Sequence, residues 1–384
     1  MALIKFLIKC LVWIFLHILY IFPVDKRRMY FSSFVGRQFS CNPKYLYNFL
    51  IASGITGYSY IWEFSDIKKA SLVPDAKVVR SRCLKSVFLC MTSKYIICNT
   101  EFPWYIPLRA CQILVQTWHG GGAYKKVGVD AGWNKIANLE QRLNSRQISF
   151  YVSSCRKFTE IMAVSKCVPP EKFLQCGMPR NSFLLSMDEA RKRKILEKMN
   201  LRSSSKIVLY APTYRGRPSF RRRETSAIPL LDIKVLRENL GAKFGGEWLI
   251  AFRGHYYDAN NEDVSQSDCI DMTAYDDMQE LLYVSDVLIT DFSSSMWDFS
   301  LTGRPVFLFA PDIDSYDVER GFYTNPYSWP FPISKTGHEL TEAIMNFNAA
   351  EYSEKVREHH NSLVSYECED SARKIFDAMG VMTE

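Results

Sequence analysis

Several signatures of familiar enzyme classes are missing from this chain of 384 residues. It has no GxxxxGKS or GxxxxGKT phosphate loop, no GxGxxG after an apolar run and no GxSxG. These absences argue against P-loop NTPases, dinucleotide-dependent dehydrogenases and α/β-hydrolases. The eleven cysteines include no CxxC pair and no zinc-type spacing with histidine. We therefore expect reduced thiols that serve as small apolar residues.

The composition is that of a globular protein, with 47% apolar and 23% charged residues. The length suits two domains, and the chain contains no internal repeat or low-complexity tract. A net charge of +7 favours anionic partners such as lipids, nucleotides or polyphosphates. This charge is too small to indicate nucleic acid, so we expect no nucleic-acid partner.

The most hydrophobic stretch runs from Ala2 to Phe22 and is followed by Pro23 and three cations. No small-residue cleavage site follows Tyr20, which argues against a signal peptide. At about 100° per residue, one third of the helix circumference carries the amphipathic residues Lys5, Lys9, Trp13, His17 and Tyr20. The pattern favours a membrane-associating helix over residues 1–28 that lies in the membrane surface. A spanning helix and a helix packed on the protein itself are the alternatives.

Short apolar runs of strand length alternate with spacers of helix length, which is typical of α/β proteins with parallel sheets. The runs cover residues 94–99, 111–117, 148–153, 206–211, 248–252, 284–289 and 305–310. A charged helical pattern over 186–199 separates the two series, with Ser186 as the expected cap. We therefore predict two α/β domains, joined near residues 180–190. Their ligands should lie beyond the carboxyl ends of the strands, in the cleft between the domains.

The stretch ITDFSSSMWDFS, residues 289–300, places three serines directly after an apolar run that begins near Tyr283. If a helix begins at Ser293 or Ser294, its backbone N–H groups and the hydroxyls of Ser293, Ser294 and Ser295 converge on one point. Such a point binds phosphate or pyrophosphate well. Ordinary capping of the helix is the alternative, because serine is a common capping residue.

The stretch QTWHGGGAYKK, residues 116–126, repeats this arrangement in the first half of the chain. The glycines, which include Gly120 and Gly121, allow a ligand to approach the backbone. His119 is a candidate general base, because histidine titrates near neutral pH. The alternative is a structural histidine at a strand end.

Two further segments carry cations near expected strand ends. Arg253 and His255 lie two residues apart after the run 248–252 and are candidates for clamping an anion. The arginine-rich segment 214–223, which includes Arg215, is either a solvated loop or a contact for lipid phosphate or pyrophosphate. Asp312 and Asp314 resemble a DxD metal motif but lack a third ligand, so we expect no metal site in the protein itself.

Taken together, these stretches resemble the CDP-glycerol glycerophosphotransferase family, whose members prime and polymerise teichoic acids and related phosphate-linked glycans. The resemblance covers about residues 95–335 in consistent order. It rests on QTWHGGGAYKK, the GMPRN turn at 177–181, APTYRG at 211–216, the segment 253–255, the run 275–294 and GRPVFLFAPDIDSYDVERGFY at 303–323.

The resemblance implies a GT-B-like α/β fold with two Rossmann-type domains. Residues 29–183 would form the acceptor-side domain, and residues 184–384 would form the domain that binds the CDP donor. It also implies transfer of a phosphoalcohol with release of CMP, at the cytoplasmic face of the cell membrane to which the protein attaches peripherally. No cofactor is expected, although a divalent cation could assist the pyrophosphate.

By position in the motifs, the resemblance implies catalytic roles for His119 and His255. It implies donor binding by Arg253, Thr213, Asp291, Ser293, Ser294 and Ser295, and acceptor or loop roles for Gly120, Gly121, Lys125 and Arg215. Two departures concern selectivity, because the family usually has HGTP where this chain has HGGG, and acidic residues where this chain continues with arginines after APTYR.

The expected reaction moves glycerol phosphate from CDP-glycerol to a lipid-pyrophosphate-linked saccharide or a growing polyol-phosphate polymer, in teichoic acid or capsule synthesis. The chain length favours a primase over a polymerase with extra domains. The alternatives are a CDP-ribitol phosphotransferase, a GT-B nucleotide-sugar glycosyltransferase and a non-catalytic membrane assembly factor.

Overall fold

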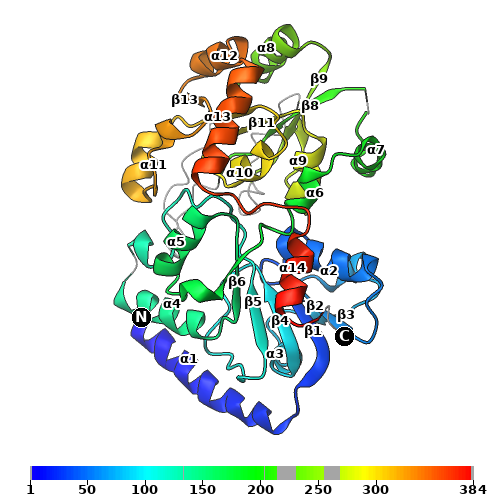
Figure 1. The fold of residues 1–384 in the computed structure, drawn as a ribbon, viewed down its shortest axis with the longest axis vertical. Helices are drawn as coiled ribbons and strands as arrows, with labels where there is room; N and C mark the ends of the chain where they lie inside the picture. The colour runs from blue at the N-terminus through cyan, green and yellow to red at the C-terminus, as the bar shows by residue number, and fades with distance from the viewer. Residues whose placement is uncertain (1, 133, 203, 214–230, 255–268, 382–384) are drawn as a thin grey trace. The chain divides into compact units, whose positions relative to one another are not determined.

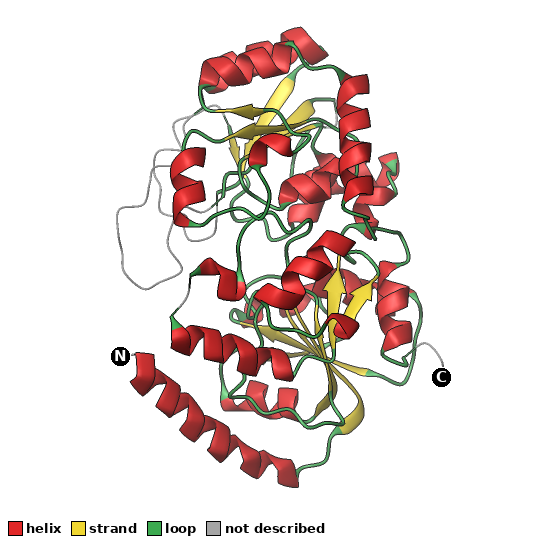
Figure 2. Cartoon of the chain, turned by 60° about the vertical axis from the view of Figure 1, so that its left-hand side comes forward, coloured by secondary structure: helices red, strands yellow, loops and turns green. Residues whose placement is uncertain are grey.

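The chain folds into two compact α/β units in the computed structural model, which describes residues 2–132, 134–202, 204–213, 231–254 and 269–381 (Figure 1). The first unit comprises Met1–Ser182 together with Val364–Glu384. The second comprises Phe183–Leu363. In each unit, helices flank a sheet of parallel strands (Figure 2).

The first sheet has seven parallel strands in the order β3-β2-β1-β4-β5-β6-β7. They are β1 (Asp25–Ser32), β2 (Ser59–Phe64), β3 (Lys77–Arg80), β4 (Ser93–Cys98), β5 (Ile113–Gln116), β6 (Phe150–Ser153) and β7 (Phe173–Gln175). Its central strands are buried on both faces, which explains why they read as continuous apolar runs. The strand order reverses between β1 and β4, where parallel sheets usually bind ligands.

The helices of the first unit connect these strands. They are α1 (Ala2–Leu16), η1 (His17–Ile21), α2 (Cys41–Ala52), η2 (Ile67–Leu72), α3 (Leu84–Met91), η3 (Gly128–Ala131), α4 (Lys135–Arg146), α5 (Arg156–Ser165), η4 (Pro170–Lys172) and α14 (Ser371–Ala378).

The second sheet has six parallel strands in the order β10-β9-β8-β11-β12-β13. They are β8 (Lys206–Tyr210), β9 (Trp248–Phe252), β10 (Ile270–Asp271), β11 (Val287–Thr290), β12 (Val306–Phe309) and β13 (Ile333–Ser334). The accompanying helices are α6 (Ser182–Leu185), α7 (Glu189–Lys198), α8 (Ile233–Phe244), α9 (Met278–Val284), α10 (Ser295–Ser300), α11 (Ile313–Glu319), η6 (Pro326–Ser328), α12 (Gly337–Met345) and α13 (Ala349–Ser362). On one side of this sheet, Leu236 and Leu240 of α8 and Leu340 and Ile344 of α12 complete the core, each pair one helical turn apart.

The predicted α/β architecture with two parallel sheets is confirmed. Some boundaries differ from the sequence reading. The N-terminal helical segment ends at Ile21, and Asp25 already begins β1. The apolar run predicted to begin near Tyr283 is helix α9 up to Val284, and strand β11 begins only at Val287. Helix α7 is capped by the Asp188 carboxylate, which accepts hydrogen bonds from two backbone N–H groups, and not by Ser186.

The last segment of the chain packs with the first unit, although the sequence analysis assigned it to the second domain. Tyr366 N donates to Ser154 O over 2.8 Å, and Phe376 of α14 stacks on Phe49 of α2 at 5.9 Å between ring centroids. Glu367 accepts hydrogen bonds from Met178 N and Asn181 Nδ2, both at 2.9 Å. Sequence patterns do not reveal this return, because it depends on contacts between residues nearly 200 positions apart.

We expect Gly177→Ala to destabilise the first unit. Gly177 has φ +77°, and a Cβ there would lie 2.8 Å from both Glu367 Cα and Tyr366 O. The left-handed conformation alone costs about 1–2 kcal/mol for an alanine, and the backbone clash adds to it. Urea unfolding followed by tryptophan fluorescence would measure the loss. Gly54→Ala is the matched control, because Gly54 has φ +63° and no atom within 4 Å of its Cβ position. Equal losses in both variants would contradict the clash.

Candidate functional site

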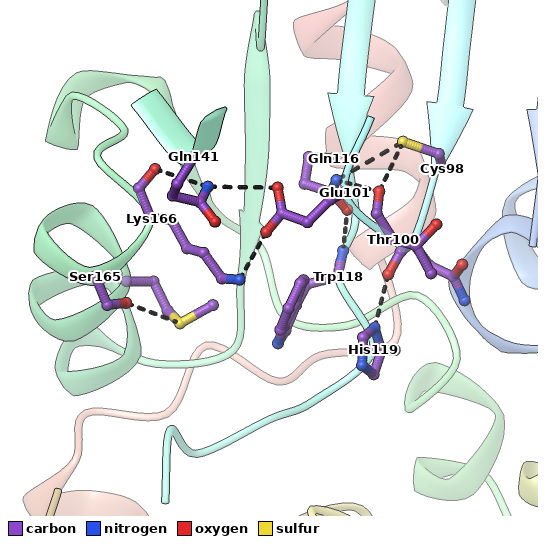
Figure 3. A network of polar contacts seen from close by, with 11 residues as sticks. Cys98, Thr100, Glu101, Gln116, Trp118, His119, Gln141, Ser165 and Lys166 are labelled. Carbon is purple, nitrogen blue, oxygen red and sulfur yellow. Dashed lines mark hydrogen bonds and ion pairs between the residues drawn. The ribbon is translucent and has the colours of Figure 1, made fainter. Parts of the chain in front are cut away.

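His119 lies at the carboxyl edge of the first sheet, three residues beyond the end of β5. Residues next to the ends of both neighbouring strands hold its loop, and Figure 3 shows the contact on the β4 side. The His119 Nδ1 atom lies 2.7 Å from the carbonyl oxygen of Asn99, which follows β4. Gly122 N donates to Ser154 Oγ, which follows β6, over 3.2 Å. The loop is therefore fixed from two sides.

This geometry determines the tautomer of His119. A carbonyl oxygen only accepts hydrogen bonds, so Nδ1 must carry the proton and Nε2 keeps its lone pair. His119 as a whole residue is exposed at the surface. Desolvation by the surrounding protein lowers the pKa of His119, and Lys166, Arg180 and Lys125 lower it further, against the effect of the Asn99 hydrogen bond. His119 is therefore neutral at physiological pH, with Nε2 able to accept a proton.

A buried asparagine that the sequence analysis did not identify supports the same loop. Asn42 Nδ2 donates to Thr117 O and Trp118 O, both at 3.0 Å. Asn42 Oδ1 accepts from Arg180 N at 3.1 Å, so the GMPRN turn is tied to the histidine loop. An asparagine at the start of a helix reads as a capping residue, which is why the sequence offered no sign of this role.

The remaining loop residues expected from the sequence lie beside His119 in the chain. Gly121 is buried, whereas Gly120 and Lys125 are half-buried. Within the loop, Trp118, Gly122 and Ala123 have positive φ values of 52°, 70° and 53°. Trp118 and Ala123 adopt the left-handed conformation although each carries a Cβ. The surrounding contacts must therefore hold the backbone of this loop in place, in addition to the freedom that its glycines provide.

The second sheet brings its candidate residues to one edge in the same way. Strands β9, β8 and β11 are neighbours. Arg253 follows β9, Thr213 follows β8, and Ser293 to Ser295 follow β11. Carboxyl ends of parallel strands meet at one sheet edge, so these three loops are adjacent.

Asp291 and Thr213 bind each other. Thr213 N lies 3.0 and 2.9 Å from the two carboxylate oxygens of Asp291, and the Thr213 hydroxyl also donates to this carboxylate. Asp291 is fully buried. The pair therefore joins the loops after β8 and β11, and its structural role is to position them.

Arg253 and Ser295 retain hydrogen-bonding capacity. Arg253 Nη2 donates to Asp276 O at 3.3 Å, but the buried Nη1 has no hydrogen-bond partner within the described structure, and neither has the buried Ser295 Oγ. Burial lowers the pKa of Arg253 to about 10, which leaves it cationic at neutral pH. Unsatisfied buried donors are rare in folded proteins, and each of these two donors is suited to bind an anion.

The serine run makes one local contact at the start of α10. Ser293 Oγ accepts from Ser295 N at 3.3 Å, which is a local turn contact of the capping kind. Ser294 is the first flanking residue of α10 and makes no capping hydrogen bond through its side chain. Helix α10 has only six residues, so its dipole is weak and any anion would be held mainly by side chains.

Two predicted site residues, His255 and Arg215, lie outside the described residues, as does the rest of the arginine-rich segment 214–223. Asp314, of the DxD-like pair, binds Lys335 Nζ at 2.8 Å. The described part of the chain contains no group of three or more metal-ligating side chains. All eleven cysteines are described and are free, and five of them are buried.

The N-terminal helical segment packs along its length against the first unit (Figures 1 and 2). Phe6 contacts Trp104 at 5.3 Å between ring centroids, and Lys9 Nζ lies 2.5 Å from Glu140 Oε1 on α4. Arg109 Nη2 donates to Leu19 O at 2.8 Å. Lys9 thus points to the protein, not to the solvent-facing side.

The rest of the segment's surface is largely apolar and exposed. The exposed large apolar residues of Ala2–Ile21 are Leu3, Ile4, Leu7, Ile8, Leu11, Val12, Trp13, Ile14, Phe15, Ile18, Tyr20 and Ile21, of which Trp13 and Tyr20 lie on the same stripe as Lys9. Ala2–Ile21 is also long and apolar enough to cross a membrane, judged by length and composition only.

The chain is similar to several bacterial proteins of teichoic acid synthesis. It is 30% identical over 369 residues to a teichoic acid poly(glycerol phosphate) polymerase of Staphylococcus epidermidis, covering 92% of this chain and 50% of that protein. It is 28% identical to a polymerase of the same name from Bacillus spizizenii, covering 93% of each. A teichoic acid glycerol-phosphate transferase of Staphylococcus aureus is 28% identical, with 91% and 92% covered. The chain thus spans about half the length of some relatives and nearly all of others.

The fold also matches a solved structure of the wall teichoic acid polymerase TagF. The TM-score is 0.81 at 28% sequence identity, with 93% of this chain and 89% of that chain covered. A sequence model of CDP-Glycerol:Poly(glycerophosphate) glycerophosphotransferase matches residues 14–380. The chain therefore belongs to the CDP-glycerol:poly(glycerophosphate) glycerophosphotransferase family.

Proposed function

We propose that this protein is an enzyme that transfers glycerol phosphate from CDP-glycerol to an acceptor hydroxyl in teichoic acid synthesis. The observation that carries the proposal is the neutral His119, whose Nδ1 is fixed by Asn99 O and whose Nε2 is left to accept a proton. Family membership supports the same reaction class. One solved TagF structure is described as containing CDPG, in line with a CDP-glycerol donor.

In the proposed reaction, the acceptor oxygen attacks the phosphorus atom that bears the glycerol. A new P–O bond forms, and the bond from this phosphorus to the bridging oxygen breaks. CMP leaves with the electron pair of that bond, while the hydroxyl proton passes to His119 Nε2. Phosphoryl transfer depends mainly on positioning and charge stabilisation. A neutral base and fixed cationic hydrogen-bond donors are therefore sufficient to catalyse it.

The donor pyrophosphate is assigned to the loops after β8, β9 and β11. Arg253 Nη1 and Ser295 Oγ supply the unsatisfied donors, with Ser293 and Ser294 beside them. Asp291 and Thr213 keep these loops together and need not touch the donor. His255 and Arg215 keep the donor and acceptor roles that the family resemblance implies.

Glycerol is the preferred donor alcohol in this proposal. Relatives named for glycerol phosphate are 28–30% identical to the chain. Relatives named for ribitol phosphate are 23–27% identical. The acceptor is assigned as a lipid-pyrophosphate-linked saccharide or the polyol-phosphate chain built on it.

We also infer peripheral attachment to the cytoplasmic face of the membrane through the exposed side of α1 and η1. A helix that crossed the bilayer could not keep the contacts that Phe6, Lys9 and Leu19 make with the first unit. A helix docked along its length, with its other side apolar, fits a surface-bound orientation.

The reaction is tested by measuring nucleotide release from CDP-glycerol and CDP-ribitol, with and without a lipid-pyrophosphate saccharide, with CMP resolved from CDP. We expect acceptor-dependent CMP from CDP-glycerol. His119→Ala should reduce turnover by about 100- to 10,000-fold, the usual range for a general base. His338→Ala is the matched control, because His338 is exposed on α12. Release of CDP from nucleotide sugars would instead indicate a glycosyltransferase, and no turnover with any donor would favour an assembly factor.

Donor binding is tested by Arg253→Gln. Loss of a hydrogen bond to a charged group costs about 1.5–3 kcal/mol, so the KM for CDP-glycerol should rise by about 10- to 150-fold. Arg357→Gln, on the exposed side of α13, serves as the control. An unchanged KM with intact folding would remove Arg253 from the donor site.

Membrane attachment is tested by sedimentation with phosphatidylglycerol-containing vesicles. Leu11 and Phe15 are 66% and 70% exposed. Replacing both by glutamate should lower binding by about tenfold or more, since burial of each side chain is worth about 1.5–3 kcal/mol. Val318→Glu is the control, because Val318 is 89% exposed on α11. Undiminished binding of the double variant would place the attachment elsewhere.

A further inference from the structure

Lys166 is a buried cation for which the proposed reaction has no role. It follows α5 and its side chain is 2% exposed. Its Nζ lies 2.6 Å from Glu101 Oε1. The same Nζ lies 3.9 Å from the centroid of the Trp118 ring, close enough for a cation–π interaction.

Trp118 links this cation to His119. The rings of Trp118 and His119 have centroids 4.4 Å apart and planes inclined by 30°. In Figure 3, the Trp118 ring stands between the Lys166 ammonium and the His119 ring. Lys166, Trp118 and His119 therefore form a continuous stack, which we call the lysine–tryptophan–histidine stack.

The stack is held from outside as well. Gln141, itself buried, donates to Glu101 Oε2 at 3.4 Å and to Lys166 O at 3.2 Å (Figure 3). Trp118 N donates to Gln116 Oε1 at 2.9 Å, which fixes a residue whose φ is +52°. The positions of both the cation and the indole are thus strongly constrained.

The Lys166 side chain is buried, whereas the Glu101 side chain is 31% exposed, so Lys166 loses its hydration while Glu101 keeps part of its own. Such a pair contributes little net stability, because the lost hydration offsets the attraction, and its position beside Trp118 suggests a role in positioning. A cation this close to the histidine opposes a second positive charge on the imidazole. The Trp118 ring, whose negative face already binds Lys166, is also a poorer partner for an imidazolium.

We propose that Lys166 is a positioning residue for His119: paired with Glu101, it fixes the Trp118 ring against the histidine and keeps the imidazole in its proton-accepting form. This inference rests on the proposed function, in which His119 is the base. The charged groups that lower the pKa of His119 are Lys166 from the end of α5, Arg180 from the GMPRN turn and Lys125 from the histidine loop. Of these, Lys166 is the one stacked through an aromatic ring.

The test is NMR titration of the full-length protein labelled with 13C at histidine Cε1. The chain has six histidines, and His119→Ala assigns the signal of interest. We expect Lys166→Met to raise the pKa of His119, because it removes a cation and leaves Glu101 nearby. We expect Glu101→Gln to lower it, because Lys166 is then no longer neutralised. In the double variant Lys166→Met with Glu101→Gln, the pKa of His119 should lie between its values in the two single variants. The double variant leaves no unpaired charge at this position, so it should remain folded even if Lys166→Met alone does not.

The pKa of His119 is expected to shift in opposite directions in Lys166→Met and Glu101→Gln, and this difference distinguishes the proposed role from a purely structural one. If the pair merely held the loop together, both single variants would loosen it and shift the pKa of His119 upward toward its ordinary value. That result, or no shift in any variant, would overturn the proposal. Lys335→Met is the matched control, because Lys335 also pairs with a carboxylate, Asp314, and lies 5.9 Å from the Tyr327 ring. It should leave His119 unchanged.

The pH profile of CMP release gives the second measurement. A neutral base is required, so kcat/KM falls as pH drops through the pKa of His119. The acid limb should move to higher pH in Lys166→Met and to lower pH in Glu101→Gln, with the KM for CDP-glycerol little changed. If His119→Ala retains full turnover, the proposed function loses its base, yet the NMR titration still decides whether Lys166 controls the histidine.

Discussion

The hydrogen bond between His119 Nδ1 and the Asn99 carbonyl is the interaction on which the candidate base depends. It exists because β4 and β5 pair in parallel with Cys98 opposite Gln116, so that the residues after both strands emerge together. Thr117 N donates to Cys98 O at 2.8 Å and extends this register by one residue. A shift in the register of β4 and β5 would move His119 away from Asn99, and Nδ1 would then no longer be fixed as the protonated nitrogen.

The second unit uses the same constraint for a different purpose. Its strand order repeats the reversal seen in the first sheet, and the loops after β8 and β11 meet at that reversal. There the buried Asp291 carboxylate joins the two loops through Thr213. In one unit, neighbouring strand ends fix a neutral proton acceptor. In the other, they fix cationic and hydroxyl donors. In the proposed reaction, both tasks need groups held rigidly before the substrate arrives.

Buried polar side chains carry much of this organisation. Asn42 satisfies two carbonyls of the histidine loop, and Glu367 satisfies two donors of the GMPRN turn. Each of these carbonyls and donors would destabilise the fold if it were left unpaired, because a buried polar group without a partner loses its hydrogen bonds to water and gains none in the protein. The contacts are therefore specific, and they tie the end of the chain to the loop that carries His119. This arrangement explains why residues 364–381 belong to the first unit.

The sequence by itself determined the α/β class, the longer parallel strands after residue 90, and the positions of His119, Arg253 and the serine run at strand ends; the short strands β7, β10 and β13 were not predicted. Those features follow from local apolar runs and from the polar residues that end them. It did not reveal β1 to β3, which follow the hydrophobic N-terminal segment and lie among polar connections. It placed Asp291 and Thr213 among the donor-site residues but did not reveal that they bind each other and join the loops after β8 and β11.

Only the tertiary structure decided which residues surround His119, the candidate base. Asn42, Glu101, Lys166 and Glu367 are far apart in sequence, and none belongs to a pattern with a period. Their roles come from long-range packing around one sheet edge, where a hydrogen bond sets the tautomer of His119, and desolvation and neighbouring cations lower its pKa. Local sequence fixes what a segment can form, because backbone preferences act over a few residues. The chemistry of a side chain depends on neighbours that only the folded chain supplies.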